Sequence, residues 1–155
     1  MPDALAYFLT WTTYGSWLPG DARRWVHKRG SAAMLYREPD SKRALFARQA
    51  MKQSPVRLDS IERRTVGDAI RRACAFKGWA IHVLNVRSNH VHVVMTAVDR
   101  SPERIMLCLK AWSSRRLNEL RGGGSRGRWW TRHGSTRYLN TPDAVERAVE
   151  YVVNQ

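Results

Sequence analysis

Polar and apolar positions alternate most clearly over residues 89–95, which read Asn-His-Val-His-Val-Val-Met. Side chains of a β-strand alternate between its two faces, so His90 and His92 should share one face while Val91 and Val93 occupy the other. The pattern therefore predicts a strand with one face packed on a core and two imidazoles side by side on the opposite face.

Three segments show the spacing of amphipathic helices, with apolar residues three and four positions apart. The first begins with the spacing of a capping box, Asp59 with Glu62. The other two begin after Ser101 and Thr141, each an N-cap residue followed by proline. We expect these helices to end at Gly78, at the glycine run 122–124 and at Gln155.

Runs of aromatic and β-branched residues between turn residues predict the remaining strands, over residues 7–14, 79–86, 128–133 and 136–139. Residues 22–54 have a weak pattern and are expected to leave the core as a basic, irregular excursion, with one short helix over 42–52. The order of elements predicts a single α+β domain spanning residues 1–155. Its expected architecture is a ferredoxin-like antiparallel sheet, with the helices on one face and the two histidines on the other.

Length and composition fit a globular domain with a real core: the chain has 155 residues, 43% of them hydrophobic. No apolar stretch is long enough to cross a bilayer, and the N-terminus does not resemble a signal peptide. Cys74 and Cys108 lie far apart within helical patterns and are expected to be reduced core residues. These features predict a cytoplasmic, nucleoid-associated protein with no membrane partner.

The strongest compositional feature is charge, with 27 Lys and Arg against 13 acidic residues and a formal net charge of +14. Seven Trp and five Tyr are interleaved with the arginines. Arginine suits phosphate and aromatic rings suit unpaired bases, so nucleic acid is the favoured partner over a basic surface with no specific ligand. The residues expected to bind DNA are Arg115, Arg116, Arg126, Arg128, Trp129, Trp130, Arg132 and Arg137.

The last predicted helix adds candidate chemistry to the histidine strand. Tyr151 and Gln155 are four residues apart, so they should be neighbours on one helix face, beside the apolar stripe. His90 and His92 can hold a metal ion, an amide oxygen can add a third ligand, and tyrosine can attack a phosphodiester that a metal polarises.

These motifs resemble those of the single-tyrosine HUH transposases, the insertion-sequence 200/605 type and their REP-associated relatives. His90-Val91-His92 is similar to the family's His-hydrophobic-His motif, and residues 151–155 are similar to its nucleophile helix. The stretches 12–21 and 132–138 also look like transposase members, and the resemblance covers nearly the whole chain. The excursion over 22–54 is longer than the family core requires.

The resemblance implies that His90, His92 and Gln155 bind Mg²⁺ or Mn²⁺ and that Tyr151 is the nucleophile. The implied substrate is single-stranded DNA, including DNA that forms hairpins, which is nicked and rejoined through a 5′-phosphotyrosine intermediate. The implied assembly is a homodimer, in which the tyrosine helix often completes the partner's site.

Two other functions also fit the residues. A non-catalytic module could bind single-stranded nucleic acid through its Arg, Trp and Tyr side chains, without cleavage or metal dependence. A small hydrolytic nuclease could use His90 and His92 as metal ligands and cleave without forming a protein–DNA adduct. Tyr138 is the rival nucleophile to Tyr151, because it also lies in an arginine-rich stretch near the C-terminus.

Overall fold

The computed structural model describes residues 4–16, 25–26, 36–37, 42, 45, 54–123 and 127–155. Its centre is a four-stranded sheet in the order β4-β5-β1-β6, and all three pairings are antiparallel. The strands are β1 (Ala6–Thr12), β4 (Ala80–Val86), β5 (His90–Thr96) and β6 (Ser135–Leu139). Within the described part of the chain, the short β2 (Trp25–Val26) pairs with β3 (Tyr36–Arg37) in a separate two-stranded sheet. The α+β fold predicted from the sequence is confirmed.

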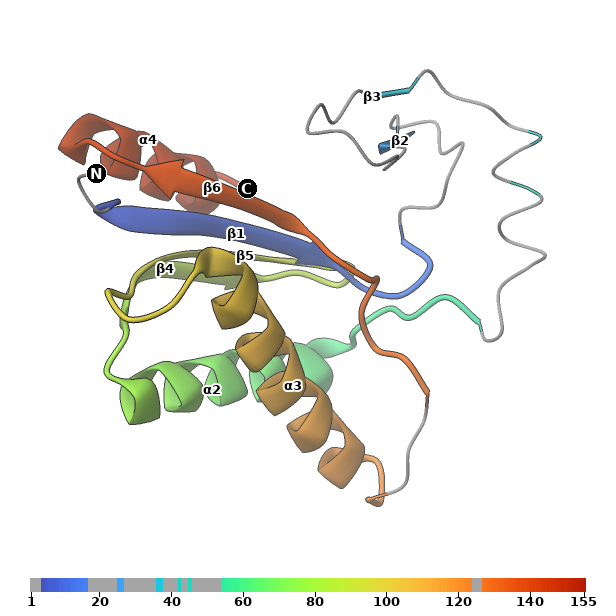
Figure 1. Ribbon diagram of the computed structural model, residues 1–155. Coiled ribbons are helices and arrows are strands. Elements are labelled where there is room, and N and C mark those ends of the chain that lie inside the picture. The colour runs from blue at the N-terminus through green and yellow to red at the C-terminus, as the bar shows by residue number, and fades with distance from the viewer. Residues whose placement is uncertain are drawn as a thin grey trace.

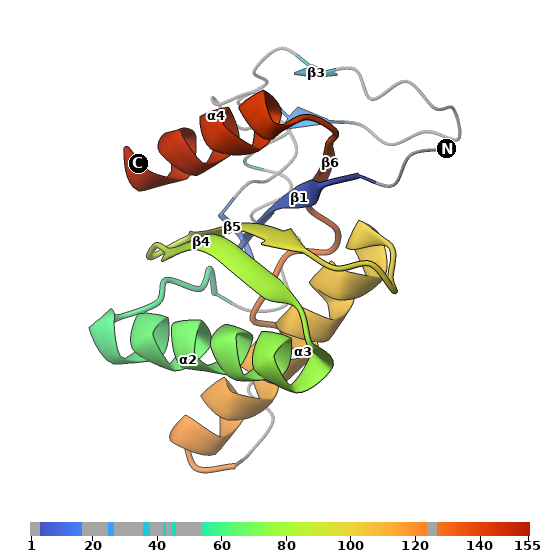
Figure 2. The ribbon, with the colours of Figure 1, turned by 90° about the vertical axis from the view of Figure 1, so that its left-hand side faces the viewer.

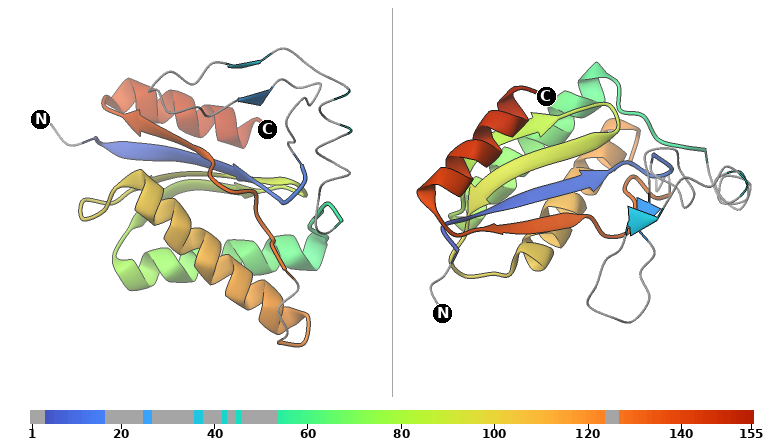
Figure 3. Two further views of the ribbon diagram at one scale, coloured as in Figure 1. Left: turned by 45° about the vertical axis from the view of Figure 1, so that its right-hand side comes forward. Right: turned by 90° about the horizontal axis from the view of Figure 1, so that it is seen from above.

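The helices divide between the two faces of the sheet (Figures 1 and 2). Helices α2 (Ser60–Lys77) and α3 (Pro102–Leu120) pack together on one face, and α4 (Pro142–Val153) lies on the other. The expectation that the histidine face would carry no helix is therefore wrong. The apolar stripe of α4 needs a surface to cover it, and Figure 3 shows this helix lying along the strands.

Each face of the sheet has its own apolar core. The larger core joins Leu9, Val91 and Val93 from the strands to α2 and α3. The smaller core joins Phe8 and Val94 to α4. Consecutive residues of β5 thus enter different cores, as alternation along a strand requires.

The helix ends follow the sequence signals. The Asp59 carboxylate accepts a hydrogen bond from the backbone N–H of Glu62 (2.8 Å), and the Glu62 carboxylate accepts one from the N–H of Asp59 (3.0 Å). Gly78 ends α2 with a φ of 75°, a left-handed conformation that glycine adopts without strain. Ser101 and Thr141 cap α3 and α4 as predicted.

Residues 128–133 do not form the predicted strand. Among the described residues of this segment, Trp130 alone makes a ladder contact, an isolated bridge to Thr13. The segment is held from two sides. The Thr131 N–H donates to the Thr12 carbonyl at the end of β1 (3.0 Å), and the buried Lys110 of α3 donates hydrogen bonds to the carbonyls of Thr131 and His133. Lys42 and Leu45 are helical, and the rest of the helix expected over 42–52 lies outside the described residues.

Cys74 is buried and Cys108 is partly buried, and both are free thiols. No helix in the described part of the chain is both long and apolar enough to cross a membrane.

Gly134 joins the 128–133 segment to β6 at a point of close approach. A Cβ at this position would lie 2.5 Å from the carbonyl oxygen of Thr10 and 2.7 Å from Sδ of Met106. We expect Gly134→Ala to lower the free energy of unfolding by about 1–3 kcal/mol, because backbone on one side prevents relaxation. Urea denaturation measures this change. The control is Gly67→Ala, whose methyl group would meet the flexible end of Arg71 at 3.2 Å and should be neutral or stabilising.

Candidate active site

The two histidines share one face of β5, as the sequence predicts. Their ring centroids are 4.7 Å apart. The facing positions on β1 are Thr12, opposite His90, and Thr10, opposite His92. This end of the sheet therefore presents two imidazoles and two hydroxyl side chains on the face that α4 partly covers.

A hydrogen bond holds Nδ1 of each imidazole. Oγ1 of Thr10 lies 2.8 Å from Nδ1 of His92, and Oδ1 of Asn89 lies 2.7 Å from Nδ1 of His90. The Asn89 oxygen accepts, so Nδ1 of His90 carries the proton. Histidine ligands commonly bind metal through one nitrogen while the other donates to a nearby oxygen. The arrangement suits coordination through Nε2 of both rings.

His92 is held in its neutral form. Burial, with smaller contributions from His90 and Arg87, lowers the pKa of His92 from 6.5 to about 4. Only 6% of its surface is exposed. A neutral imidazole keeps the lone pair that binds a cation, so the ring is ready to act as a ligand at neutral pH.

Tyr151 lies next to this pair within the same chain. Its ring centroid is 5.9 Å from that of His92 and 6.0 Å from that of Phe8. The side chain is 53% exposed. The helix thus anchors the ring on Phe8 and His92 while leaving about half of the side chain accessible to a substrate.

The end of α4 approaches the β4–β5 turn, where the histidine strand begins. The Arg87 guanidinium donates a hydrogen bond of 2.7 Å to the backbone carbonyl of Gln155. Asn154 N–H still bonds to the Glu150 carbonyl at 3.0 Å, so helical spacing continues past the last residue of α4. Gln155 itself follows the C-cap, and its N–H donates to the Val152 carbonyl at 3.3 Å.

The donor set fits a divalent cation that also takes an amide oxygen. Among the described residues, no group of three His, Cys, Asp or Glu side chains could hold a metal ion. A site built on His90 and His92 must therefore draw its third protein ligand from another residue type. Gln155 offers such an oxygen, and Mg²⁺ and Mn²⁺ accept mixed nitrogen and oxygen ligands.

The residues expected to bind DNA lie in three places. Arg137 is opposite Phe8 in the sheet register, so it shares the histidine face. Arg128 and Arg132 line a pocket beside α3. Arg115 and Arg116 are exposed on α3, on the other side of the sheet, and Arg126 lies outside the described residues.

Trp129 and Trp130 are core residues rather than open stacking platforms. They are 2% and 4% exposed. Their indole N–H groups donate to Oδ1 of Asn118 (2.8 Å) and to the carbonyl of Lys110 (3.3 Å). The expectation that their rings stack on bases does not fit this packing, because both rings are buried and both indole N–H groups bond to residues of α3.

Thr10, Asn89 and Arg87 belong to the site, but sequence reasoning did not identify them. Asn89 precedes the histidine motif directly, so its reach to His90 was visible in the sequence. Thr10 and Arg87 join the site only through strand register and helix packing, for which the sequence carries no local signal.

Comparison with known proteins identifies the family. Residues 49–155 match the family described as "Transposase IS200 like". The chain belongs to the IS200-like transposase family. No curated protein matches the chain.

Solved structures of transposases share the fold. A structure titled as a candidate transposase from Deinococcus radiodurans R1 is 16% identical, with a TM-score of 0.53, over 98% of this chain and 91% of that one. The structure of a REP-associated tyrosine transposase bound to a REP hairpin is 12% identical, with a TM-score of 0.54. That match covers 97% of this chain and 65% of the REP-associated transposase, so the present chain spans less than two thirds of that protein's length.

Proposed function

We propose that this IS200-like transposase nicks and rejoins single-stranded DNA through a covalent bond to Tyr151, in a reaction that depends on Mg²⁺ or Mn²⁺. The observation that carries the proposal is the contact between Tyr151 and His92 within one chain, with ring centroids 5.9 Å apart. A nucleophile and a pair of metal ligands on one surface are what phosphodiester cleavage requires.

His90, His92 and Gln155 would hold the cation. Bound there, a divalent ion would supply Lewis-acid polarisation of the scissile phosphate. The protein's part is to fix the two imidazoles through Thr10 and Asn89 and to aim Tyr151 at the phosphorus. The Arg87 guanidinium, tied to the end of α4, adds positive charge near His92.

The covalent step balances without a nucleotide cofactor. The Tyr151 phenol oxygen attacks the phosphorus and loses its proton, and the bond from phosphorus to the 3′ oxygen breaks. The leaving 3′ oxygen takes up one proton and becomes a 3′-OH. The product is a 5′-phosphotyrosine linkage that retains the phosphodiester's energy. Attack by a 3′-OH on the same phosphorus reverses the step and releases the tyrosine.

One gel experiment tests the function. The protein is incubated with Mg²⁺ and labelled single-stranded DNA from the region that flanks its gene, including imperfect hairpins, and is then separated under denaturing conditions. We expect a labelled protein–DNA adduct and a shortened strand. Cleavage without adduct would favour a hydrolytic nuclease, and binding without cleavage would favour a non-catalytic module.

The partners in this proposal are hairpin-forming single-stranded DNA and a second copy of the chain. The REP hairpin held by the structurally similar transposase supports the first. The homodimer follows from the family resemblance, and size measurement by light scattering tests it.

The hydrogen bond from Thr10 to His92 predicts a measurable effect on metal affinity. Thr10→Val keeps the β-branched shape but removes the hydroxyl that holds Nδ1 of His92. We expect Mn²⁺ affinity to fall about 10–100-fold, because groups that orient a histidine ligand typically contribute that much. Calorimetric titration of Mn²⁺ measures the change. Thr136→Val, on the opposite face of the sheet, should bind Mn²⁺ as the wild type does.

A further inference from the structure

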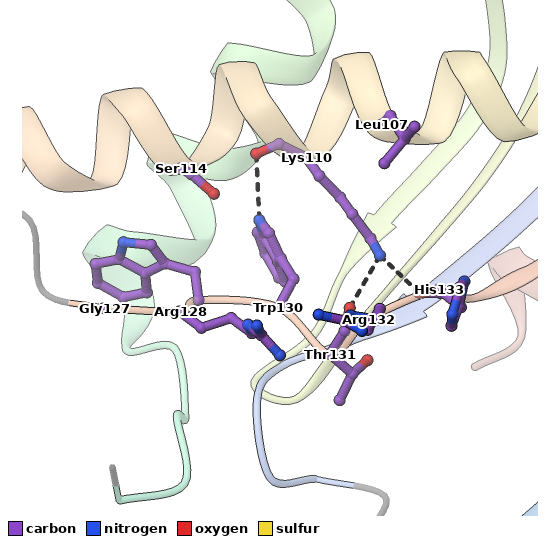
Figure 4. A pocket seen from close by; sticks show the side chains of 10 residues that line it. Leu107, Lys110, Ser114, Gly127, Arg128, Trp130, Thr131, Arg132 and His133 are labelled. Atoms are coloured by element: carbon purple, nitrogen blue, oxygen red, sulfur yellow. Dashed lines mark hydrogen bonds between the residues drawn. The ribbon is translucent and has the colours of Figure 1, made fainter. Parts of the chain in front are cut away.

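A basic hollow lies on the side of the sheet opposite the histidines, between α3 and the 127–133 segment (Figure 4). Its volume is about 280 Å³. Lys110 and Ser114 line it from α3, and Arg128, Arg132 and His133 line it from the segment. No acidic side chain is among the described residues that line it, so the lining carries positive charge.

Lys110 is the unusual residue of this pocket. Its side chain is only 9% exposed, and its Nζ donates hydrogen bonds to the carbonyls of Thr131 (3.0 Å) and His133 (2.6 Å), as Figure 4 shows. An ammonium group has three N–H donors, and these carbonyls use two of them. The third can serve an acceptor placed in the pocket.

A buried ammonium with only neutral acceptors is poorly stabilised. Burial lowers the pKa of Lys110 from 10.5 to about 8. An anion in the pocket would restore the balance, because an opposite charge nearby favours the protonated form.

The pocket connects to the histidine site through Thr131. The Thr131 carbonyl binds Lys110, while its hydroxyl lies 2.7 Å from the Thr12 hydroxyl. Thr12 is the residue opposite His90 in the sheet. The pocket and the histidine site therefore lie at the same end of β1.

We propose that this pocket binds a backbone phosphate of the DNA strand that enters the histidine site, with Lys110 and Arg132 as its ligands. The proposal rests on the proposed function only in taking single-stranded DNA as the ligand. The alternative is that Lys110 is a structural strut that holds residues 131–133 on α3.

The lysine Nζ resonances report directly on this pocket. In ¹⁵N-labelled protein, an oligothymidylate of about ten nucleotides is added while the Lys110 resonance is followed across pH. We expect the resonance to shift and the pKa to rise when DNA binds. A Lys110 signal that stays unchanged while DNA saturates the protein overturns the proposal, as does a response to inorganic phosphate but none to DNA.

Substitution separates a phosphate ligand from a structural strut. Arg132→Gln removes an exposed charge and should reduce the slope of log affinity against log salt by about 0.7, the value for one phosphate contact on a single strand. Arg72→Gln, an exposed position on α2, is the matched control and should leave the slope unchanged. Equal slopes for the two variants contradict the proposal.

Lys110→Met tests the buried charge itself, after a thermal melt shows that the variant is folded. We expect the slope of log affinity against log salt to decrease by a similar amount. If Lys110→Met does not fold, Arg132→Gln keeps the test decisive. If the wild-type protein forms the adduct but its Lys110 resonance does not change with DNA, the pocket proposal is wrong and the nicking function stands. If the Lys110 resonance changes but no adduct forms, the pocket proposal stands and the nicking function is wrong.

Discussion

Tyr151→Phe is expected to abolish the covalent protein–DNA adduct while leaving DNA affinity nearly unchanged. The substitution removes only the phenol oxygen, which is the atom proposed to bond to phosphorus. Loss of a nucleophile typically lowers the rate by on the order of 10³-fold or more. Affinity should persist because it depends mainly on contacts between basic side chains and phosphates. The denaturing gel measures the adduct, and fluorescence anisotropy measures the binding.

Packing should also survive this substitution. The Tyr151 ring contacts Phe8 and His92 through its faces and edges, and phenylalanine keeps these contacts. Among the described residues, the Tyr151 hydroxyl makes no hydrogen bond, so the substitution removes none. If Tyr151→Phe forms no adduct but melts at the wild-type temperature, the loss is due to the missing nucleophile and not to unfolding.

Tyr138→Phe is the matched control, because Tyr138 is 56% exposed against 53% for Tyr151. In the sheet register Tyr138 is opposite Tyr7, and their rings meet edge to face at 5.4 Å. Tyr7 alternates with Phe8, so Tyr138 points to the face opposite the histidines. We expect Tyr138→Phe to form adduct normally. Adduct from Tyr151→Phe but none from Tyr138→Phe would show that the nucleophile is assigned to the wrong tyrosine.

The sequence predicted those features that depend on local periodicity and on capping. The alternation in residues 89–95 correctly placed His90 and His92 on one face, because a strand leaves no other choice. The caps at Asp59, Ser101 and Thr141 correctly placed the helix starts, since each offers an oxygen to backbone N–H groups that no helical carbonyl can reach.

Features that depend on long-range packing were not predicted. The stripe of α4 showed that one side of the helix is buried, but not which face of the sheet would bury it. Residues 128–133 have strand-forming side chains, yet two buried indoles and Lys110 hold them against α3. The positions of Thr10 and Arg87 in the site depend on how distant segments meet, and neither carries a local signal of that meeting.

Removing the cation, or one of its proposed ligands, should have the second large effect. We expect His90→Ala, and separately excess chelator, to reduce nicking and adduct formation by on the order of 10³-fold or more. Binding of the same DNA should fall only slightly. His90 is the better ligand to replace, because His92 is 6% exposed and its loss would also leave a cavity beside Phe8.

His82→Ala is the control that isolates the role of His90. His82 is exposed on β4, and its Nε2 lies 2.7 Å from Oγ1 of Thr96, at the opposite end of β5 from His90. It is therefore a histidine on the same sheet that no proposed ligand contacts. We expect His82→Ala to nick DNA at the wild-type rate and to respond to chelator as the wild type does. If chelator left the wild type active, or if His90→Ala and His82→Ala behaved alike, the imidazole pair would not be a metal site. A third outcome is that His90→Ala loses activity but regains it at Mn²⁺ concentrations above those that the wild type needs, while chelator only weakens the wild type. This outcome would show that His90 tunes the metal affinity of a site that the remaining ligands still form.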